Sequence, residues 1–278
     1  MAEEIIWHRL ESQVRRRMEE FPGVAGVCVL DLTAGEGFSV LGDEVFPTAS
    51  TIKIHVLTQL LLRAERGEID LNESVTITSD VHVPGSGVLT YLGEPLELTL
   101  LDVATLMIIV SDNTATNLCI DVAGIEGTNQ LIEDLGLTST VLRRKMQDHE
   151  AVARGEENVA TPNDCVKMLQ LLYEGQPTPE VAEQCIAILK KRKSATLFSS
   201  AIPRTVPLAN KPGGMSRVRC DAGIVFLERR PYAMAIMTKY ALCEHPDQER
   251  FIIDTARLIH GTMSVLADTN QYGQGLES

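Results

Sequence analysis

The distribution of strand-like and helix-like segments constrains this chain most, because strand patterns lie near both ends and helical patterns fill the middle. β-Branched and apolar runs bounded by turn residues occur at 24–32, 38–41, 206–212, 220–228 and 232–238. The first two predict an antiparallel hairpin. The last three are joined by expected turns from Gly213-Gly214 to Arg217 and at 229–231. Together they predict one sheet assembled from two distant parts of the chain.

Apolar residues at helical spacing predict helices between and around these strands. The expected helices cover 4–20, about 50–66, 96–110, 115–123, 128–135, 161–173, 179–191 and 247–266. Thr161 or Asn163 is expected to cap the helix that begins there. A short strand is expected at 75–78, whereas 143–158 is polar and aperiodic and indicates a long surface loop.

These elements place the chain in the α/β (α+β) class, with an antiparallel sheet flanked by helices plus an all-helical lobe. No internal repeat and no linker is visible, which predicts a single domain over residues 1–278. The α/β lobe is expected from about 1–48 and 195–278, and the helical lobe from about 49–194. Chemistry is expected in a cleft between the two lobes.

Composition excludes several classes of partner. The chain is 44% hydrophobic and 23% charged, as in soluble globular proteins, and its formal net charge of −13 disfavours nucleic acid and anionic membranes. No apolar run approaches a membrane span, and the N-terminus lacks the pattern of a secretory signal. We therefore expect a cytoplasmic protein, or a periplasmic or secreted one if a leader has been removed. The oligomeric state stays open.

The cysteines and known cofactor motifs indicate neither a metal nor a cofactor. The six cysteines are scattered without metal-ligand spacing and are expected to be mostly buried, reduced thiols, with disulfides possible after export. The sequence contains no dinucleotide-binding glycine pattern and no phosphate-binding loop. The expected partner is a small-molecule substrate.

The stretch Ser50-Thr51-Ile52-Lys53 carries the first chemical signal. If Ser50 begins a helix, the Lys53 amine lies one turn later, beside the Ser50 oxygen. A desolvated neutral lysine can take the proton of a serine hydroxyl, and free N–H groups at a helix start can hold an oxyanion. The same pattern is also typical of a helix cap followed by a solvated lysine.

Two further motifs decide between these interpretations. Ser111-Asp112-Asn113 lies between two expected helices, and Lys211-Pro212-Gly213 lies on the strand that leads the late three-strand run. With Ser50-x-x-Lys53, they resemble the three signatures of class A β-lactamases and penicillin-binding proteins. The resemblance covers nearly the whole chain, since the expected elements follow that family's order.

The resemblance implies catalytic roles for three residues. Ser50 would be the acylated nucleophile, Lys53 its base or proton relay, and Ser111 the group that passes a proton to the leaving nitrogen. The implied substrate is a β-lactam or a related amide or ester.

The resemblance also implies substrate-binding roles. Asn113 would hold the substrate amide, Lys211 would favour a substrate carboxylate, and Gly213 completes the Lys-x-Gly triplet. The backbone N–H groups of Ser50 and Gly214 would form the oxyanion hole.

Two positions depart from the family pattern. Pro212 replaces a Thr or Ser whose hydroxyl contacts the substrate carboxylate in that family. Arg217 or Arg219 is a candidate to take over that contact, or else each is an ordinary solvated surface arginine. The loop before Thr161 also lacks the Glu-x-x-Leu-Asn pattern whose Glu activates the deacylating water. Asp148 and Glu150 are candidates for that role, or else ordinary surface acids.

Three functions remain open from the sequence. The first is a serine hydrolase of the β-lactamase type, and the second an esterase or D-alanyl peptidase or amidase on the same fold. The third is a penicillin-binding protein that acylates without efficient turnover. His55 is expected to be a packed or surface histidine, and His82 and His149 are expected in loops near the cleft.

Overall fold

The computed structural model describes residues 2–191, 196–270 and 272–276, and its central feature is a five-stranded antiparallel sheet with strand order β2-β1-β9-β8-β7. The strands are β1 (Val24–Asp31), β2 (Gly37–Val40), β7 (Leu208–Met215), β8 (Val218–Val225) and β9 (Tyr232–Lys239). β1 pairs with β9 along its full length, from Val24 opposite Lys239 to Asp31 opposite Tyr232. The prediction that two distant segments join in one sheet is therefore confirmed.

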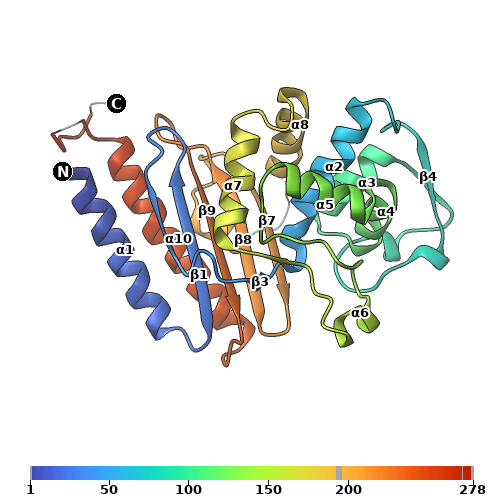
Figure 1. Ribbon diagram of the computed structural model, residues 1–278, viewed down its shortest axis with the longest axis horizontal. Coiled ribbons are helices and arrows are strands. Elements are labelled where there is room, and N and C mark those ends of the chain that lie inside the picture. Colours follow the sequence, from blue (N-terminus) through green and yellow to red (C-terminus); the bar gives the residue numbers. More distant parts are fainter. Residues whose placement is uncertain (1, 192–195, 271, 277–278) are drawn as a thin grey trace.

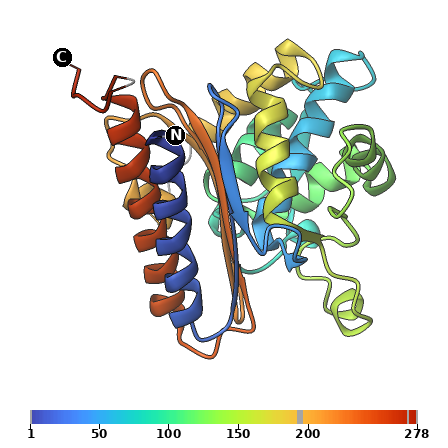
Figure 2. The same ribbon diagram turned by 60° about the vertical axis from the view of Figure 1, so that its left-hand side comes forward.

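Helices cover both faces of this sheet (Figures 1 and 2). α1 (Ala2–Glu20) and α10 (His245–Ala267) lie on one face, whereas α7 (Pro162–Tyr173) and α8 (Pro179–Lys190) lie on the other. Successive strand residues point to opposite faces, so β1 needs apolar side chains on both sides. Accordingly, Val27 packs in the cluster that contains Trp7 of α1, and Cys28 packs in the cluster of the opposite face.

The remaining elements form a region beside β7, on the right of Figure 1. Its helices are α2 (Lys53–Glu65), α3 (Leu100–Ile109), α4 (Asn113–Ala123), α5 (Ile125–Asp134) and the short α6 (His149–Ala153). A further short helix, α9 (Phe198–Ala201), directly precedes β7 and contacts α10. Two small sheets pair β3 (Phe46–Pro47) with β6 (Val159–Ala160) and β4 (Ser74–Ile77) with β5 (Leu96–Thr99). Residues 53–62 of α2 are all buried, which makes α2 the central helix of this region.

Three expectations about local structure were wrong. Residues 96–99 form β5 rather than the start of a helix, so the helical region is not all-helical. α3 begins only at Leu100, because the Thr99 hydroxyl caps it by accepting from Asp102 N. Gly213 and Gly214 lie inside β7, and the turn follows Met215. Arg217, with φ of 58°, lies in that turn.

Other expectations at this level are confirmed. Thr161 caps α7 by accepting from Asp164 N, and α8 ends at Lys190. Residues 143–158 are mostly irregular, with α6 inserted. The division into lobes near residues 48 and 195 stays a prediction, although α7, which that division assigned to the helical lobe, packs on β1 and β9.

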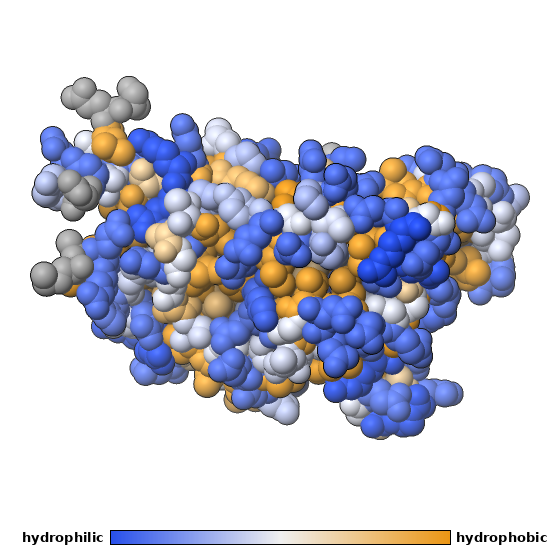
Figure 3. Space-filling model, turned by 45° about the horizontal axis from the view of Figure 1, so that its top comes forward, coloured by the Kyte–Doolittle hydropathy of each residue, from blue (hydrophilic) through white to orange (hydrophobic). Residues whose placement is uncertain are grey.

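The surface of the protein is mostly hydrophilic on the face drawn in Figure 3, with apolar residues gathered near its middle. Within the described residues, no helix combines the length and apolar character needed to span a membrane. All six cysteines are free thiols, and each except Cys243 is buried.

Candidate active site

Ser50 lies in a 3₁₀ turn, Ala49–Ile52, that leads directly into α2. The turn is fastened through Thr48, whose backbone N–H and hydroxyl both donate to Asn158 O, at 2.9 and 3.1 Å. The Thr48 carbonyl in turn accepts from Thr51 N at 2.9 Å and from Cys220 Sγ at 3.0 Å. Ala49 has φ of 45°, an uncommon conformation for a residue with a side chain. Two distant segments of the chain, at Asn158 and at Cys220, therefore fasten the turn that carries the half-buried Ser50.

Gly213 allows β7 to approach this turn closely. A Cβ at Gly213 would lie 2.7 Å from Ser50 N, 2.9 Å from Thr48 O and 2.9 Å from Cys220 Sγ, all closer than real Cβ contacts allow. The glycine of the Lys-x-Gly triplet is therefore the residue that lets an edge strand lie against the backbone of Ser50.

Lys53 is the first residue of α2 and is completely buried. Its Nζ donates to Ser111 O at 2.9 Å, to Ser111 Oγ at 3.0 Å and to Asn113 Oδ1 at 3.4 Å. Burial, aided by the positive charge of Lys211, lowers the pKa of Lys53 well below its usual value. Contrary to expectation, the amine donates to Ser111 and Asn113, and in the part of the chain that the structure describes it makes no hydrogen bond to Ser50.

Ser111 lies between α3 and α4 with φ of 57°. The next residue, Asp112, is buried and caps α4 by accepting from Ala115 N at 2.9 Å. Its other oxygen accepts from Val88 N at 2.7 Å and Leu89 N at 2.9 Å. The middle residue of the Ser-Asp-Asn motif thus has a structural task, which is to tie the 84–92 loop to the helix that carries the site.

Asn113, the third residue of that motif, is held from the opposite side. Its backbone N–H donates to Ser86 O at 2.9 Å, and its Nδ2 donates to Pro84 O at 2.9 Å. Because Oδ1 accepts from Lys53, the side chain is oriented at both ends of its amide.

Lys211 is 1% exposed and reaches Ser111 from the sheet side. Its Nζ donates to Ser111 Oγ at 3.0 Å and to Pro212 O at 2.9 Å. Burial lowers the pKa of Lys211 to about 8, and the negative charge of Asp221 opposes that shift. Two amines, one from α2 and one from β7, therefore converge on one hydroxyl oxygen.

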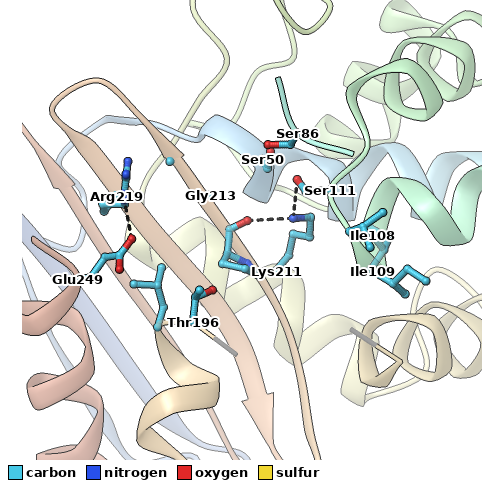
Figure 4. Close-up of a pocket in the computed structure, with 14 residues that line it drawn as sticks. Ser50, Ser86, Ile108, Ile109, Ser111, Thr196, Lys211, Gly213, Arg219 and Glu249 are labelled. Atoms are coloured by element: carbon cyan, nitrogen blue, oxygen red, sulfur yellow. Dashed lines mark hydrogen bonds and ion pairs between the residues drawn. The ribbon is translucent and has the colours of Figure 1, made fainter. Parts of the chain in front are cut away.

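Ser50, Ser111 and Lys211 border a cavity of about 480 Å³ (Figure 4). Its lining consists of Ser50, Ser86, Ile108, Ile109, Val110, Ser111, Thr196, Leu197, Lys211, Pro212, Gly213, Gly214, Arg219 and Glu249. In Figure 4, Ser50, Ser86 and Ser111 lie toward one end, and Arg219 and Glu249 lie toward the other. Arg219 Nε is 3.5 Å from the Glu249 carboxylate.

Of the arginines and carboxylates that the sequence offered as candidates for substrate binding or water activation, only one lines the cavity. Arg219 lines the cavity, whereas Arg217 donates to Ala241 O at 2.7 Å and does not line it. Asp148 caps α6 by accepting from Ala151 N at 2.9 Å, and Glu150 is exposed. Among the described residues that line the cavity, Glu249 is the only carboxylate.

The three singled-out histidines lie outside the cavity lining. His55 is buried within α2, and burial lowers its pKa to about 4, which agrees with the packed interpretation. His82 Nδ1 lies 3.7 Å from Glu94 in the 79–95 segment, and His149 is exposed at the start of α6. In residues 2–191, 196–270 and 272–276, no three or more His, Cys, Asp or Glu side chains group as metal ligands.

Several residues at the site were missed from the sequence. Ser86, Thr196 and Glu249 line the cavity, and Asn158 holds the nucleophile turn. Each lies outside the three motifs and far from them in sequence, so no local pattern marked them.

The chain is similar to known proteins in both sequence and structure. A family model described as the β-lactamase enzyme family matches residues 9–263. β-Lactamase AER-1 of Aeromonas hydrophila is 26% identical over 192 residues, which is 68% of this chain and 63% of that protein, so the match spans less than two thirds of that relative. β-Lactamase CARB-3 of Pseudomonas aeruginosa is 26% identical over 251 residues, 87% of this chain and 86% of that protein.

Solved structures agree with the sequence matches. The β-lactamase from Sphaerobacter thermophilus superposes with a TM-score of 0.86 at 31% identity, covering 92% of this chain and 97% of that one. PBP-A superposes with a TM-score of 0.82 at 29% identity, covering 91% and 95%. A mutant of PBP-A has been solved as an acyl-enzyme complex with penicillin G.

Proposed function

Because the chain belongs to the β-lactamase enzyme family, we propose that it is a serine hydrolase that opens β-lactams through an acyl-enzyme at Ser50. The observation that carries the proposal is the convergence of Lys53 Nζ and Lys211 Nζ on Ser111 Oγ, each at 3.0 Å, beside a cavity that Ser50 lines. This arrangement supplies a nucleophile, a base and a proton relay in one place.

Lys53 is the base for acylation. Burial and the charge of Lys211 lower the pKa of Lys53 and so favour its neutral form, whose lone pair can accept a proton. Lys211, with a pKa of about 8, keeps its charge there, so two similar side chains take different roles because their environments differ.

Ser111 is the relay to the leaving nitrogen. A hydroxyl oxygen has two acceptor lone pairs and one hydrogen, and Lys53 and Lys211 occupy both lone pairs. The hydroxyl hydrogen of Ser111 is therefore directed away from both amines and is available to the nitrogen that departs when the lactam C–N bond breaks. The proton taken from Ser50 returns to that nitrogen through Lys53 and Ser111.

The oxyanion is held by the backbone N–H groups of Ser50 and Gly214. Along an edge strand, N–H groups alternate between the ladder and the open side. Pro212 has no N–H group, and an edge strand tolerates proline where the missing N–H would face the open side. Gly214 lies two residues further along β7, so its backbone N–H faces that open side as well. Since Gly213 lies against Ser50 N, the two N–H groups border the same end of the cavity.

The substrate is held between two ends of the cavity. The positive charge of Arg219 favours a carboxylate at one end, and that of Lys211 adds to it from beside Ser111. Thr196 also lines the cavity and offers a hydroxyl, where Pro212 offers none. Glu249 pairs with Arg219 and weakens its attraction for an anion. Asn113 keeps one Nδ2 hydrogen for a substrate amide.

Hydrolysis of the acyl-enzyme requires an activated water. Asp148 is engaged as the cap of α6, and Glu249 is paired with Arg219. The neutral amine of Lys53 is therefore the base we assign to this step as well, and it returns to its starting state after each turnover.

Mass spectrometry of the intact protein tests the proposal. Wild type mixed with penicillin G and quenched after seconds should gain the mass of one ring-opened penicillin, and the adduct should disappear over longer times. Ser50→Ala should show no adduct, whereas Ser39→Ala, a serine outside the cavity, should behave as wild type. An adduct that persists in Ser50→Ala, or none in wild type, would contradict the proposal.

A further inference from the structure

Two primary amides meet around Gly85, just beyond the Ser50 end of the cavity. A Cβ at Gly85 would lie 2.9 Å from Asn113 Nδ2 and 3.0 Å from Gln147 Nε2. Gly85 has φ of 100°, so both its conformation and its surroundings require glycine. The next residue, Ser86, lines the cavity. The absent side chain of Gly85 thus brings Gln147 close to Asn113.

The backbone on both sides of Gln147 is anchored. Met146 N donates to Asn117 Oδ1 at 2.8 Å, and Asn117 Nδ2 donates to Met146 O at 3.1 Å, so α4 fixes the preceding residue. Asp148 follows and caps α6. Gln147 itself has φ of 60°, a conformation that costs free energy in a residue with a side chain and that the two anchors maintain.

The Gln147 amide is the unused group of this arrangement. The side chain is exposed, and among the described residues its amide makes no hydrogen bond. Asn113, by contrast, accepts from Lys53 and donates to Pro84, and keeps one Nδ2 hydrogen. A free amide beside a partly engaged one supplies donors and an acceptor without any charge.

The position of this pair relative to the cavity suggests what it contacts. Arg219 supplies positive charge toward one end, and the amide pair at Gly85 adjoins Ser86, which lies toward the opposite end with Ser50 and Ser111. A substrate that directs its carboxylate toward Arg219 directs its other substituent toward Gln147. A neutral amide pair suits a neutral, peptide-like group there.

We propose that Gln147 is a specificity-determining residue that donates a hydrogen bond to the carbonyl of an acylamino substituent on the substrate, next to Asn113. The inference rests on the proposed function, because it concerns the substrate of the same Ser50 site. It makes acylation selective for β-lactams that carry an amide-linked side chain.

The experiment compares two β-lactams that share the bicyclic ring. Penicillin G carries an acylamino group, and 6-aminopenicillanic acid carries a free amine in its place. Acylation of Ser50 is followed by rapid-quench mass spectrometry over a range of concentrations, which separates the apparent dissociation constant from the limiting rate constant. The variants are Gln147→Ala, Gln147→Met, which keeps the length without the amide, and Glu150→Ala as an exposed control on the same loop.

The proposal expects Gln147→Ala and Gln147→Met to lose about tenfold in acylation efficiency with penicillin G, which corresponds to one hydrogen bond, chiefly through the dissociation constant. With 6-aminopenicillanic acid the change should stay below about twofold. Glu150→Ala should match wild type with both compounds.

Each other outcome overturns the inference in a distinguishable way. Equal losses with both compounds would assign Gln147 a structural role, and no loss with either would remove it from the site. In both cases Ser50 is still acylated, so the proposed function stands. If wild type is acylated by neither compound, the proposed function fails and the inference fails with it.

Discussion

The amines of Lys53 and Lys211 donate to the same oxygen, Ser111 Oγ, each across 3.0 Å. Two ammonium groups so close together and so deeply buried repel each other strongly. Lys53, completely buried and facing the charge of Lys211, is the one whose pKa falls further. The pair therefore favours a neutral amine at Lys53 beside an ammonium group at Lys211.

This relationship predicts the pH dependence of acylation. The rate should rise with pH as Lys53 loses its proton, and fall again above about pH 8 as Lys211 loses its own. In Lys211→Met the upper limb should disappear, and the lower limb should move to higher pH because the charge that depresses the pKa of Lys53 is gone. Acylation by penicillin G, whose carboxylate stays ionised from pH 5 to pH 10, checks this across that range. Lys191→Met, at an exposed lysine, serves as the control.

Lys53→Met should separate stability from activity. Burial disfavours the charged amine, so the pKa of Lys53 is lower in the folded chain than its usual value of about 10.5. Between these two pKa values, the unfolded chain binds more protons than the folded chain. The stability of wild type therefore rises with pH across this window. Near pH 7, the unfolding free energy of Lys53→Met should exceed that of wild type by about 1–2 kcal/mol, and the variant should unfold at a higher temperature. This difference in stability should shrink toward pH 10.

Acylation by Lys53→Met should fall at least about a thousandfold, the scale of a lost general base. Thermal unfolding by calorimetry at several pH values, together with acylation rates, checks both parts. A variant that is less stable than wild type at pH 7 would contradict the cost assigned to the buried amine.

Gly213→Ala should damage the site more than the fold. The added methyl group would lie 2.7 Å from Ser50 N, so β7 or the nucleophile turn must move. We expect a loss of about 1–3 kcal/mol in unfolding free energy and at least about a hundredfold loss in acylation, because the oxyanion donors move with β7. Gly93→Ala is the matched control, since a Cβ there meets no atom within 4 Å. Acylation of Gly213→Ala at the wild-type rate would show that the close approach is dispensable.

Asp148→Asn and Glu150→Gln should leave deacylation unchanged within about twofold. Neither carboxylate lines the cavity, and asparagine preserves the cap of α6. The measurement is the decay of the acyl-enzyme after excess penicillin is removed. A decay slowed more than about tenfold in either variant, with acylation intact, would assign that residue to the activation of water instead of Lys53.

Local patterns sufficed for much of the fold. The hairpin at 24–41 and the Thr161 cap were predictable because side-chain alternation, turn residues and caps depend on near neighbours. Residues 96–99 were not, because their strand conformation comes from pairing with β4, about 20 residues earlier. Gly213 and Gly214 were read as turn residues for the same reason, since only the ladder with β8 keeps them extended.

The chemistry of the site was likewise predictable in part from the sequence and depended in part on the tertiary structure. The sequence by itself determined which residue types were present, since Ser50, Lys53, Ser111 and Lys211 follow from motifs and spacing. Only the tertiary structure decided that both amines meet on Ser111, that Arg219 and not Arg217 borders the cavity, and that Gln147 lies beside Asn113. The physical reason is that desolvation, pKa and hydrogen-bond geometry depend on segments far apart in the chain, which come together only when the sheet and the helices pack.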